Sequence, residues 1–456
     1  MVRTSRWAAS QVGVMPAGTS VGKDSDAIMN NSGNHLKTAS GLQRRSWVRA
    51  RSMRDRLLVL TPLCLFALLG LMSSSCLDST DPASPGKARP RILWTRLLPD
   101  DVVGQPTVDP AGNVLLQTAA RRIVSLSSTG SVRWSVRTGG PSAPFLASDS
   151  AGNTYLAILS HGKSHLLALD HAGRHRWTFR AECPIDSSPV VGEGTVYVTD
   201  DQSRLYALAS NGQLRWAFQP QGDVETGAIP VSVGRDGSVY LVTSCLDSAE
   251  MAEKGGHARI YALTSGGRLR WQLALPHARA APPVVAPDGT LYVGNDEYVD
   301  GEVRGRSTIL ALDPAGSTVW RQGGMYIDPG AVSSDGVVFA VAGPSGTSSN
   351  PDPSLHRLVA FGRDGRRLFE LVLRRSSSRS GEAGLSTPAL GPRGSVLVGA
   401  RPDDSTDGQG LLHSIDSAGR QRWVLPTRDL PTPLGVAGDS AYVLDGPRRV
   451  VALRDP

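Results

Sequence analysis

The stretch LLALDHAGRHRW (166–177) decides the fold, because close copies of it recur along the chain. The clearest copies are LYALASNGQLRW (205–216), IYALTSGGRLRW (260–271) and ILALDPAGSTVW (309–320), and weaker ones lie at 123–134, 358–369 and 412–423. Each copy predicts two β segments joined by a tight turn, in which glycine supplies a positive φ. The chain is therefore expected to consist of many short strands.

A second pattern lies upstream of each copy, as in SSPVVGEGTVYV (187–198) and APPVVAPDGTLYV (281–293), and it predicts two further strands. A four-stranded unit that repeats every ~40–50 residues is typical of a propeller blade. The units begin near 105, 141, 187, 227, 280, 328, 386 and 432. We therefore expect an all-β fold over residues 91–456, an eight-bladed β-propeller of four-stranded antiparallel blades.

The two ends of this region complement each other. The last unit stops after its third strand, whereas PRILWTRL (90–97) carries an orphan Trp94. The N-terminal strand is thus expected to complete the last blade, which closes the ring and removes free sheet edges.

One tryptophan recurs at the same place in seven units, and Phe369 takes that place in the remaining one. A constant position favours a structural role, in which each indole docks between its own blade and the next and buries roughly 200 Å². The alternative is a platform that stacks sugars or a cofactor. The seven tryptophans expected to dock between blades are Trp94, Trp134, Trp177, Trp216, Trp271, Trp320 and Trp423.

A leader precedes the repeats. Residues 57–72 are apolar, Arg54 and Arg56 come before them, and three serines and Cys76 follow. The apolar run is shorter than the ~20 residues of a membrane span, and the pattern is typical of an export signal. It resembles a bacterial lipoprotein signal over residues 53–75 with lipidation at Cys76, although Ser73 stands where such signals usually carry Leu. The alternatives are an ordinary secretory signal and an uncleaved anchor.

The flanking segments complete the expected organisation. Because signals begin near the N-terminus, we expect translation to start at Met53 and residues 1–52 to be a disordered extension. Residues 76–90 are expected to form the lipid anchor and a flexible tether. Leu77, rather than Asp, follows the lipidated cysteine, which favours the bacterial outer membrane as the location.

The net charge of +7 does not indicate nucleic-acid binding. Residues 1–58 hold ten Lys/Arg and three Asp, so they carry the whole excess, and residues 59–456 balance to zero. A basic, polyanion-binding surface is therefore not expected on the propeller.

Two cysteines, Cys183 and Cys245, lie in the propeller, in loops on one face of neighbouring blades. In an exported protein such a pair can form a disulfide. The alternative is two unpaired buried thiols.

The repeated Ala-Leu-Asp-x-x-Gly-x-x-x-Trp motif resembles the pyrroloquinoline-quinone (PQQ) type propeller repeat over roughly residues 90–456. One branch of that group is the quinoprotein dehydrogenases. The other is non-enzymatic and includes the lipoprotein subunit of the outer-membrane β-barrel assembly machine. The dehydrogenases use an adjacent Cys-Cys disulfide, which this chain lacks. Metalloprotease and nucleophile-elbow motifs are also missing. We therefore expect no catalytic residues, no cofactor and no enzyme activity.

Four neighbouring blades carry long connections between their second and third strands, at 244–258, 295–307, 343–356 and 400–410. Alternating strand direction places these loops on one face, where grouped loops on a rigid scaffold typically form an interaction site. Their acidic side chains suit a basic partner or weak calcium binding, and the alternative is solvated insertions. The candidate partner-binding residues are Asp247, Glu253, Asp296, Glu297, Tyr298, Asp300, Asp403 and Asp404.

These observations predict a monomeric, non-catalytic, membrane-tethered propeller of the cell envelope. It is expected to serve as a scaffold that binds envelope proteins or cell-surface polymers. The alternatives are a PQQ-dependent quinoprotein oxidoreductase and a sugar-binding surface propeller.

Overall fold

Short strands dominate a computed structural model of the chain. It describes residues 89–138, 142–160, 163–185, 187–221, 231–243, 258–275, 279–280, 282–296, 298–299, 302–303, 308–323, 326–343, 355–375, 384–401 and 409–456. Within them the one helical element is a 3-10 turn, η1 (Pro392–Gly394). In this part of the chain, no helix combines the length and the apolar character needed to cross a membrane.

The strands of the first four blades follow one another in chain order. Blade 1 contains β2 (Val102–Val108), β3 (Val114–Thr118), β4 (Arg122–Leu126) and β5 (Val132–Arg137). Blade 2 contains β6 (Ser142–Ser148), β7 (Thr154–Ser160), β8 (Lys163–Leu169) and β9 (His175–Phe179). Blade 3 contains β10 (Val190–Gly192), β11 (Thr195–Thr199), β12 (Leu205–Ala209) and β13 (Leu214–Phe218). Blade 4 contains β14 (Ser232–Val233), β15 (Val239–Thr243), β16 (Arg259–Leu263) and β17 (Leu269–Ala274).

The remaining blades repeat this order, with an addition in blade 5. Blade 5 contains β18 (Arg279–Ala280), β19 (Val284–Val285), β20 (Leu291–Asp296), β23 (Thr308–Leu312) and β24 (Thr318–Gly323), with the hairpin β21 (Tyr298–Val299) and β22 (Glu302–Val303) between β20 and β23. Blade 6 contains β25 (Tyr326–Val332), β26 (Val338–Gly343), β27 (Leu355–Phe361) and β28 (Arg367–Arg375). Blade 7 contains β29 (Ala389–Leu390), β30 (Val396–Ala400), β31 (Gly410–Ile415) and β32 (Gln421–Thr427). Blade 8 contains β33 (Pro431–Ala437), β34 (Ser440–Asp445), β35 (Arg449–Arg454) and β1 (Arg91–Leu97).

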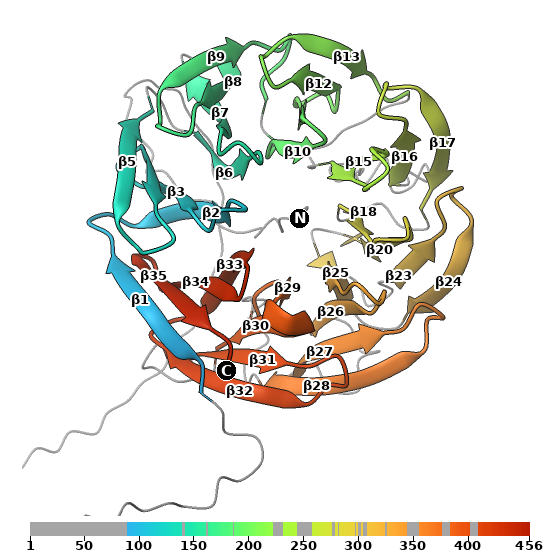
Figure 1. Cartoon of the computed structure of the whole chain (residues 1–456). Coiled ribbons are helices and arrows are strands. Elements are labelled where there is room, and N and C mark those ends of the chain that lie inside the picture. The colour runs from blue at the N-terminus through green and yellow to red at the C-terminus, as the bar shows by residue number, and fades with distance from the viewer. Residues whose placement is uncertain are drawn as a thin grey trace, which may run out of the picture. The chain divides into compact units, whose positions relative to one another are not determined.

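The expected eight-bladed propeller of four-stranded antiparallel sheets is confirmed. First strands such as β6 and β10 lie innermost, and fourth strands such as β9 and β13 lie at the circumference (Figure 1). A parallel bridge between Gln105 and Phe145 joins blades 1 and 2 into one eight-stranded sheet, which the sequence pattern did not indicate.

The hydrophobic core lies between neighbouring blades. One cluster joins Tyr240 and Ile260 of blade 4 to Leu291 and Leu310 of blade 5. Because successive residues of a strand face opposite sides of a sheet, each buried strand contributes to two such clusters. The core is therefore a ring of layers between blades, and each blade depends on both of its neighbours.

A β-bulge recurs where the third strand meets the fourth. In blade 2, Ala168 pairs with Trp177 and Leu169 pairs with His175, so that Arg176 is the extra residue. The same irregularity occurs in blades 1 and 3 to 7. A bulge bends the strand and increases its twist. In each of these blades it lies immediately before the aromatic residue of the repeat.

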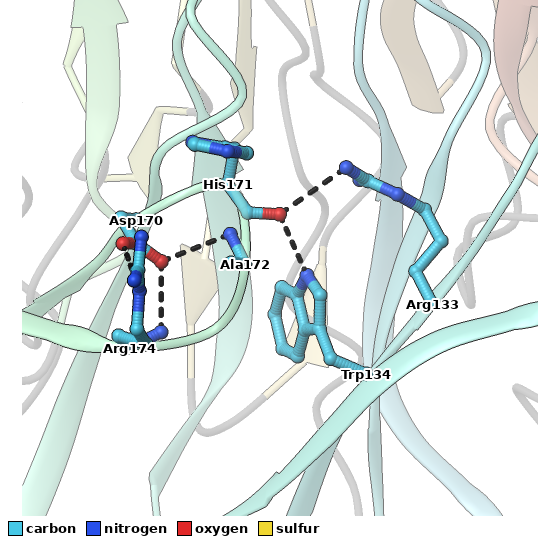
Figure 2. A network of polar contacts seen from close by, with 6 residues as sticks. All are labelled: Arg133, Trp134, Asp170, His171, Ala172 and Arg174. Atoms are coloured by element: carbon cyan, nitrogen blue, oxygen red, sulfur yellow. Dashed lines mark hydrogen bonds and ion pairs between the residues drawn. The ribbon is translucent and has the colours of Figure 1, made fainter.

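The tryptophans dock onto the turn of the following blade, as Figure 2 shows for Trp134. The indole Nε1 of Trp134 donates a hydrogen bond to the carbonyl oxygen of His171 at 2.9 Å, and Arg133 donates to the same oxygen at 3.2 Å. The equivalent indole-to-carbonyl bonds are Trp94 to Ser128, Trp177 to Ser210, Trp216 to Ser265, Trp271 to Pro314 and Trp320 to Arg363. Since each bond joins two blades, the repeated tryptophan links neighbouring units.

The glycine of the repeat makes room for that indole. Gly173 has a φ of +80°, and a Cβ built on it would lie 2.7 Å from Cδ2 of Trp134. The same clash with the preceding blade's aromatic ring would arise at Gly130, Gly212, Gly267, Gly316, Gly365 and Gly419. Glycine is thus required twice at this position, for its backbone conformation and for the close approach of the ring.

The aspartate of the repeat holds the turn. In Figure 2, Oδ1 of Asp170 accepts hydrogen bonds from the backbone N–H groups of Ala172 at 2.9 Å and Arg174 at 2.8 Å. The bond from the backbone of Arg174 holds the pKa of Asp170 below its usual range, so the carboxylate stays ionised. Asp313 and Asp416 accept equivalent pairs of bonds. These carboxylates are therefore occupied within their own turns.

Closure of the ring by the N-terminal strand is confirmed. β1 pairs antiparallel with β35, with Arg91 opposite Arg454 and Leu97 opposite Arg449. Because these two strands come from opposite ends of the propeller, no turn connects them. Asp455 occupies the position of that turn: its Oδ1 accepts from Nε1 of Trp423 at 2.5 Å, and its Oδ2 pairs with Nη1 of Arg422 at 2.7 Å.

Replacing Asp455 is expected to loosen this closure. Asp455→Ala removes both the indole acceptor and the ion pair and should cost about 2–3 kcal/mol, whereas Asp455→Asn keeps an oxygen for Trp423 and should cost about 1 kcal/mol. Urea unfolding followed by tryptophan fluorescence measures both. Asp439→Asn, an exposed change in the same blade, is the control and should stay within about 0.5 kcal/mol of the wild type. An Asp455→Ala midpoint equal to that of the control would contradict the assigned role.

Candidate partner-binding face

The two faces of the propeller carry different connections. One face, here called the rim face, carries the connections from second to third strands, such as 119–121, 200–204 and 446–448, and those between blades, such as 428–430. The opposite face, here called the turn face, carries the Asp-x-x-Gly turns described above. The docking tryptophans bond to the turn face, so the rim face is the one that the repeat leaves free to vary.

The candidate residues predicted on the rim face fall largely outside the residues that the structure describes. This holds for Asp247, Glu253, Glu297, Asp300, Asp403 and Asp404, and also for Cys76 and Cys245. The backbones of Asp296 and Tyr298 are described and belong to blade 5. The proposed roles of these residues and the Cys183–Cys245 bridge remain predictions.

Blade 5 shows what one of the long rim connections forms. β20 extends to Asp296, and the chain then forms the separate hairpin of β21 and β22, in which Tyr298 pairs with Val303 and Val299 with Glu302. The chain returns to the blade at Thr308, which lies opposite Asn295. The insertion thus has strand structure of its own outside the four-stranded blade.

The rim of blade 3 is a hydrogen-bonded cluster around Asp200. Its carboxylate accepts bonds from the backbone N–H of Arg204 at 2.9 Å and from the hydroxyl of Tyr206 at 2.9 Å, and Arg204 pairs with Glu182. Burial, followed by the bond to Asp200, raises the pKa of Tyr206 to about 12. The turn is therefore held rigidly by its own side chains.

Cys183 lies beside this cluster and is half-buried. Its burial, together with the carboxylates of Asp200 and Asp201, raises the pKa of its thiol. Since the thiolate is the nucleophilic form of cysteine, this environment does not activate Cys183 for nucleophilic chemistry.

Between blades 7 and 8 the rim face is hollowed. The hollow has a volume of about 460 Å³ and is lined by Gln409, Pro426, Thr427, Arg428 and Arg449. The sequence pattern did not indicate it, because blade 8 has a short loop and the predicted binding face rested on the long loops. The two arginines of the hollow come from separate stretches of sequence, Arg428 from PTRDL (426–430) and Arg449 from DGPRRV (445–450).

The described part of the chain contains His, Cys, Asp and Glu, which are the usual side chains that bind metal ions. No group of three or more His, Cys, Asp or Glu side chains gathers there in a way that could hold a metal ion.

Comparison with protein families identifies a matching family. A family model described as outer membrane protein assembly factor BamB matches residues 86–177 and 162–322, which together make up more than half of the chain. A curated relative, the serine/threonine-protein kinase AfsK of Streptomyces griseus, is 33% identical over 142 residues. That stretch is 30% of this chain, and the chain spans only 15% of the length of the kinase.

Solved structures share the fold at low identity. BamB from Moraxella catarrhalis superimposes with a TM-score of 0.54 at 16% identity, covering 80% of this chain and 100% of that one. The quinohemoprotein alcohol dehydrogenase ADHIIG from Pseudomonas putida HK5 gives 0.52 at 11%, covering 80% and 76%. The C-terminal WD40 domain of Sif2 gives 0.54 at 10%, covering 81% and 99%. Because these neighbours carry different names and share one architecture, they show the fold alone.

Proposed function

The chain belongs to the propeller family described as outer membrane protein assembly factor BamB, and on that premise we propose that it is a non-catalytic scaffold that binds proteins of the cell envelope. The proposal places the propeller on the bacterial outer membrane, tethered by a lipid on Cys76. Its partner is engaged by the rim face of blades 4 to 7.

The uneven rim face is the observation that carries this proposal. The recurring Trp, Gly and Asp residues have structural roles: they dock neighbouring blades together and hold the turns. The long rim connections, by contrast, break the regularity of the repeat in four neighbouring blades, and the hairpin of β21 and β22 adds structure that the blade does not need. Added loops on a rigid scaffold are where binding function is usually found.

A loop replacement tests the proposal. Since Asn295 and Thr308 lie opposite each other in the ladder, an Asn-Gly turn can replace residues 296–307 and close the hairpin directly. Crosslinking in the native envelope, followed by mass spectrometry, should then recover the partner at a level reduced at least ~10-fold, as expected when central contacts of an interface are removed. The melting temperature of the variant checks that the blade still folds.

The control changes the opposite face. Glu193, Asp335 and Asp439 are exposed in first-to-second-strand turns on the turn face, and neutralising all three as Gln, Asn and Asn should leave partner recovery unchanged. Unchanged recovery with the rim variant would refute the rim-face assignment. Reduction of a dye by the purified protein in the presence of PQQ would refute the non-catalytic assignment.

A further inference from the structure

We propose that the hollow between blades 7 and 8 binds a carboxylate that carries an apolar substituent. The hollow opens on the rim face beside the end of β32, where the chain crosses from blade 7 to blade 8. Figure 1 shows β32 and β33, the two strands that this crossing joins. The hollow is a shallow depression, largely open to solvent, with a volume of about 460 Å³. This inference is independent of the scaffold function proposed above.

The mouth of the hollow carries positive charge that the described side chains leave partly unpaired. Arg428 is exposed, and no described residue pairs with its guanidinium group. Arg449 pairs with Asp445, yet its Nε is buried without a hydrogen bond among the described residues. Guanidinium groups are the side chains best suited to hold a carboxylate.

The acidic side chains nearby that the structure describes, Asp445 and Asp429, are already engaged with other groups. Asp445 is only 2% exposed, and besides Arg449 it accepts a hydrogen bond from the backbone N–H of Arg428 at 2.7 Å. Asp429 pairs with Arg401 at 2.9 Å. Among the described residues, Arg428, Arg449 and the Asp445 that pairs with Arg449 leave one positive charge at the mouth.

The inner end of the hollow is apolar. A crevice of about 30 Å³ shares Pro426, Thr427 and Arg449 with it. The rest of the crevice is lined by Asp445 and by six apolar residues, which are Ile92, Leu412, Leu425, Val443, Val451 and Leu453. An apolar space of this size favours a methyl-sized group over an ordered water, which needs two or more polar partners. A ligand that satisfies both ends has a carboxylate at the arginines and an aliphatic group directed into the crevice.

The test uses N-acetyl-leucine, which has both features. Isothermal titration at low salt is expected to give a dissociation constant on the order of 1 mM, in keeping with the size of the ligand. N-acetyl-glycine lacks the aliphatic group and should bind at least about 5-fold more weakly. N-acetyl-leucinamide lacks the charge and should bind at least about 10-fold more weakly. A tetrapeptide that ends in Leu with a free carboxylate distinguishes two sources of the ligand. If the natural ligand is the C-terminal end of a peptide, the tetrapeptide should bind more tightly than N-acetyl-leucine. If it is a small free acid, N-acetyl-leucine should bind as tightly as the tetrapeptide or more tightly.

Two arginine variants distinguish binding in the hollow from non-specific attraction of the ligand to positive charge on the protein. Arg428→Gln should weaken binding of N-acetyl-leucine about 10-fold, whereas Arg366→Gln, an exposed arginine on the turn face, should leave it unchanged. Equal binding of the acid and the amide overturns the proposal, as does equal or tighter binding of inorganic phosphate. The absence of any heat change up to 20-fold above the expected dissociation constant also overturns it.

Discussion

Deleting residues 1–97 is expected to destabilise the whole propeller and to make it aggregate. The deletion removes β1, and with it the ladder to β35 and the indole of Trp94 that bonds to Ser128 of blade 1 at 2.7 Å. Loss of a packed tryptophan alone costs about 3–5 kcal/mol, and the exposed edge of β35 offers a template for pairing between molecules. We expect a fall in melting temperature of about 10 °C or more, with aggregates visible by size-exclusion chromatography.

A shorter deletion is the matched control. Removing residues 1–88 leaves β1 intact, and the melting temperature should stay within about 1–2 °C of that of the full chain. Both proteins are produced without export, so that the leader plays no part in the comparison. If the two truncated proteins have the same melting temperature, β1 is not the closing strand of the ring in solution.

Ring closure was predictable because it follows from two local patterns. The last unit lacks a Gly-x-x-x-Trp strand, and Trp94 stands without the rest of its unit. With a repeat period of 40–50 residues, the N-terminal strand and the incomplete last unit have few other strands to pair with. The bridge between Gln105 and Phe145 had no such signal, since a single contact between inner strands depends on how closely two blades approach.

The hollow was unpredictable from the repeat for the same physical reason. Beside the hollow, the chain at 429–431 packs tightly against blade 7, where Gly399 faces the carbonyl of Pro431 and Gly410 faces the carbonyl of Asp429 with no room for a side chain. Such close approaches leave no periodic trace in the sequence. The predicted rim residues came from loop length, which locates a face but not the positions of individual side chains.

Replacing Gly173 by Ala is expected to cost far more than the same change at Gly194. Both glycines have positive φ, +80° and +71°, but a Cβ at Gly194 meets nothing within 4 Å, whereas at Gly173 it meets Trp134 at 2.7 Å. Gly194→Ala should therefore cost only the backbone term, about 1 kcal/mol. Gly173→Ala should also displace the indole and weaken its bond to His171, which adds about 2 kcal/mol of overpacking. Urea unfolding of the two variants measures the difference.

A double-mutant cycle shows whether that difference arises from the indole. In a Trp134→Ala background the space beside Gly173 is empty, so Gly173→Ala should cost only about 1 kcal/mol, as at Gly194, and the coupling energy should be about 2 kcal/mol. A coupling near zero would mean that the glycine is needed for its φ alone. In that case the seven clashes between glycine and ring along the propeller would be incidental. A coupling of the expected size means that the glycine is also needed to admit the aromatic ring of the preceding blade, which is Phe369 at Gly419 and tryptophan at the other positions.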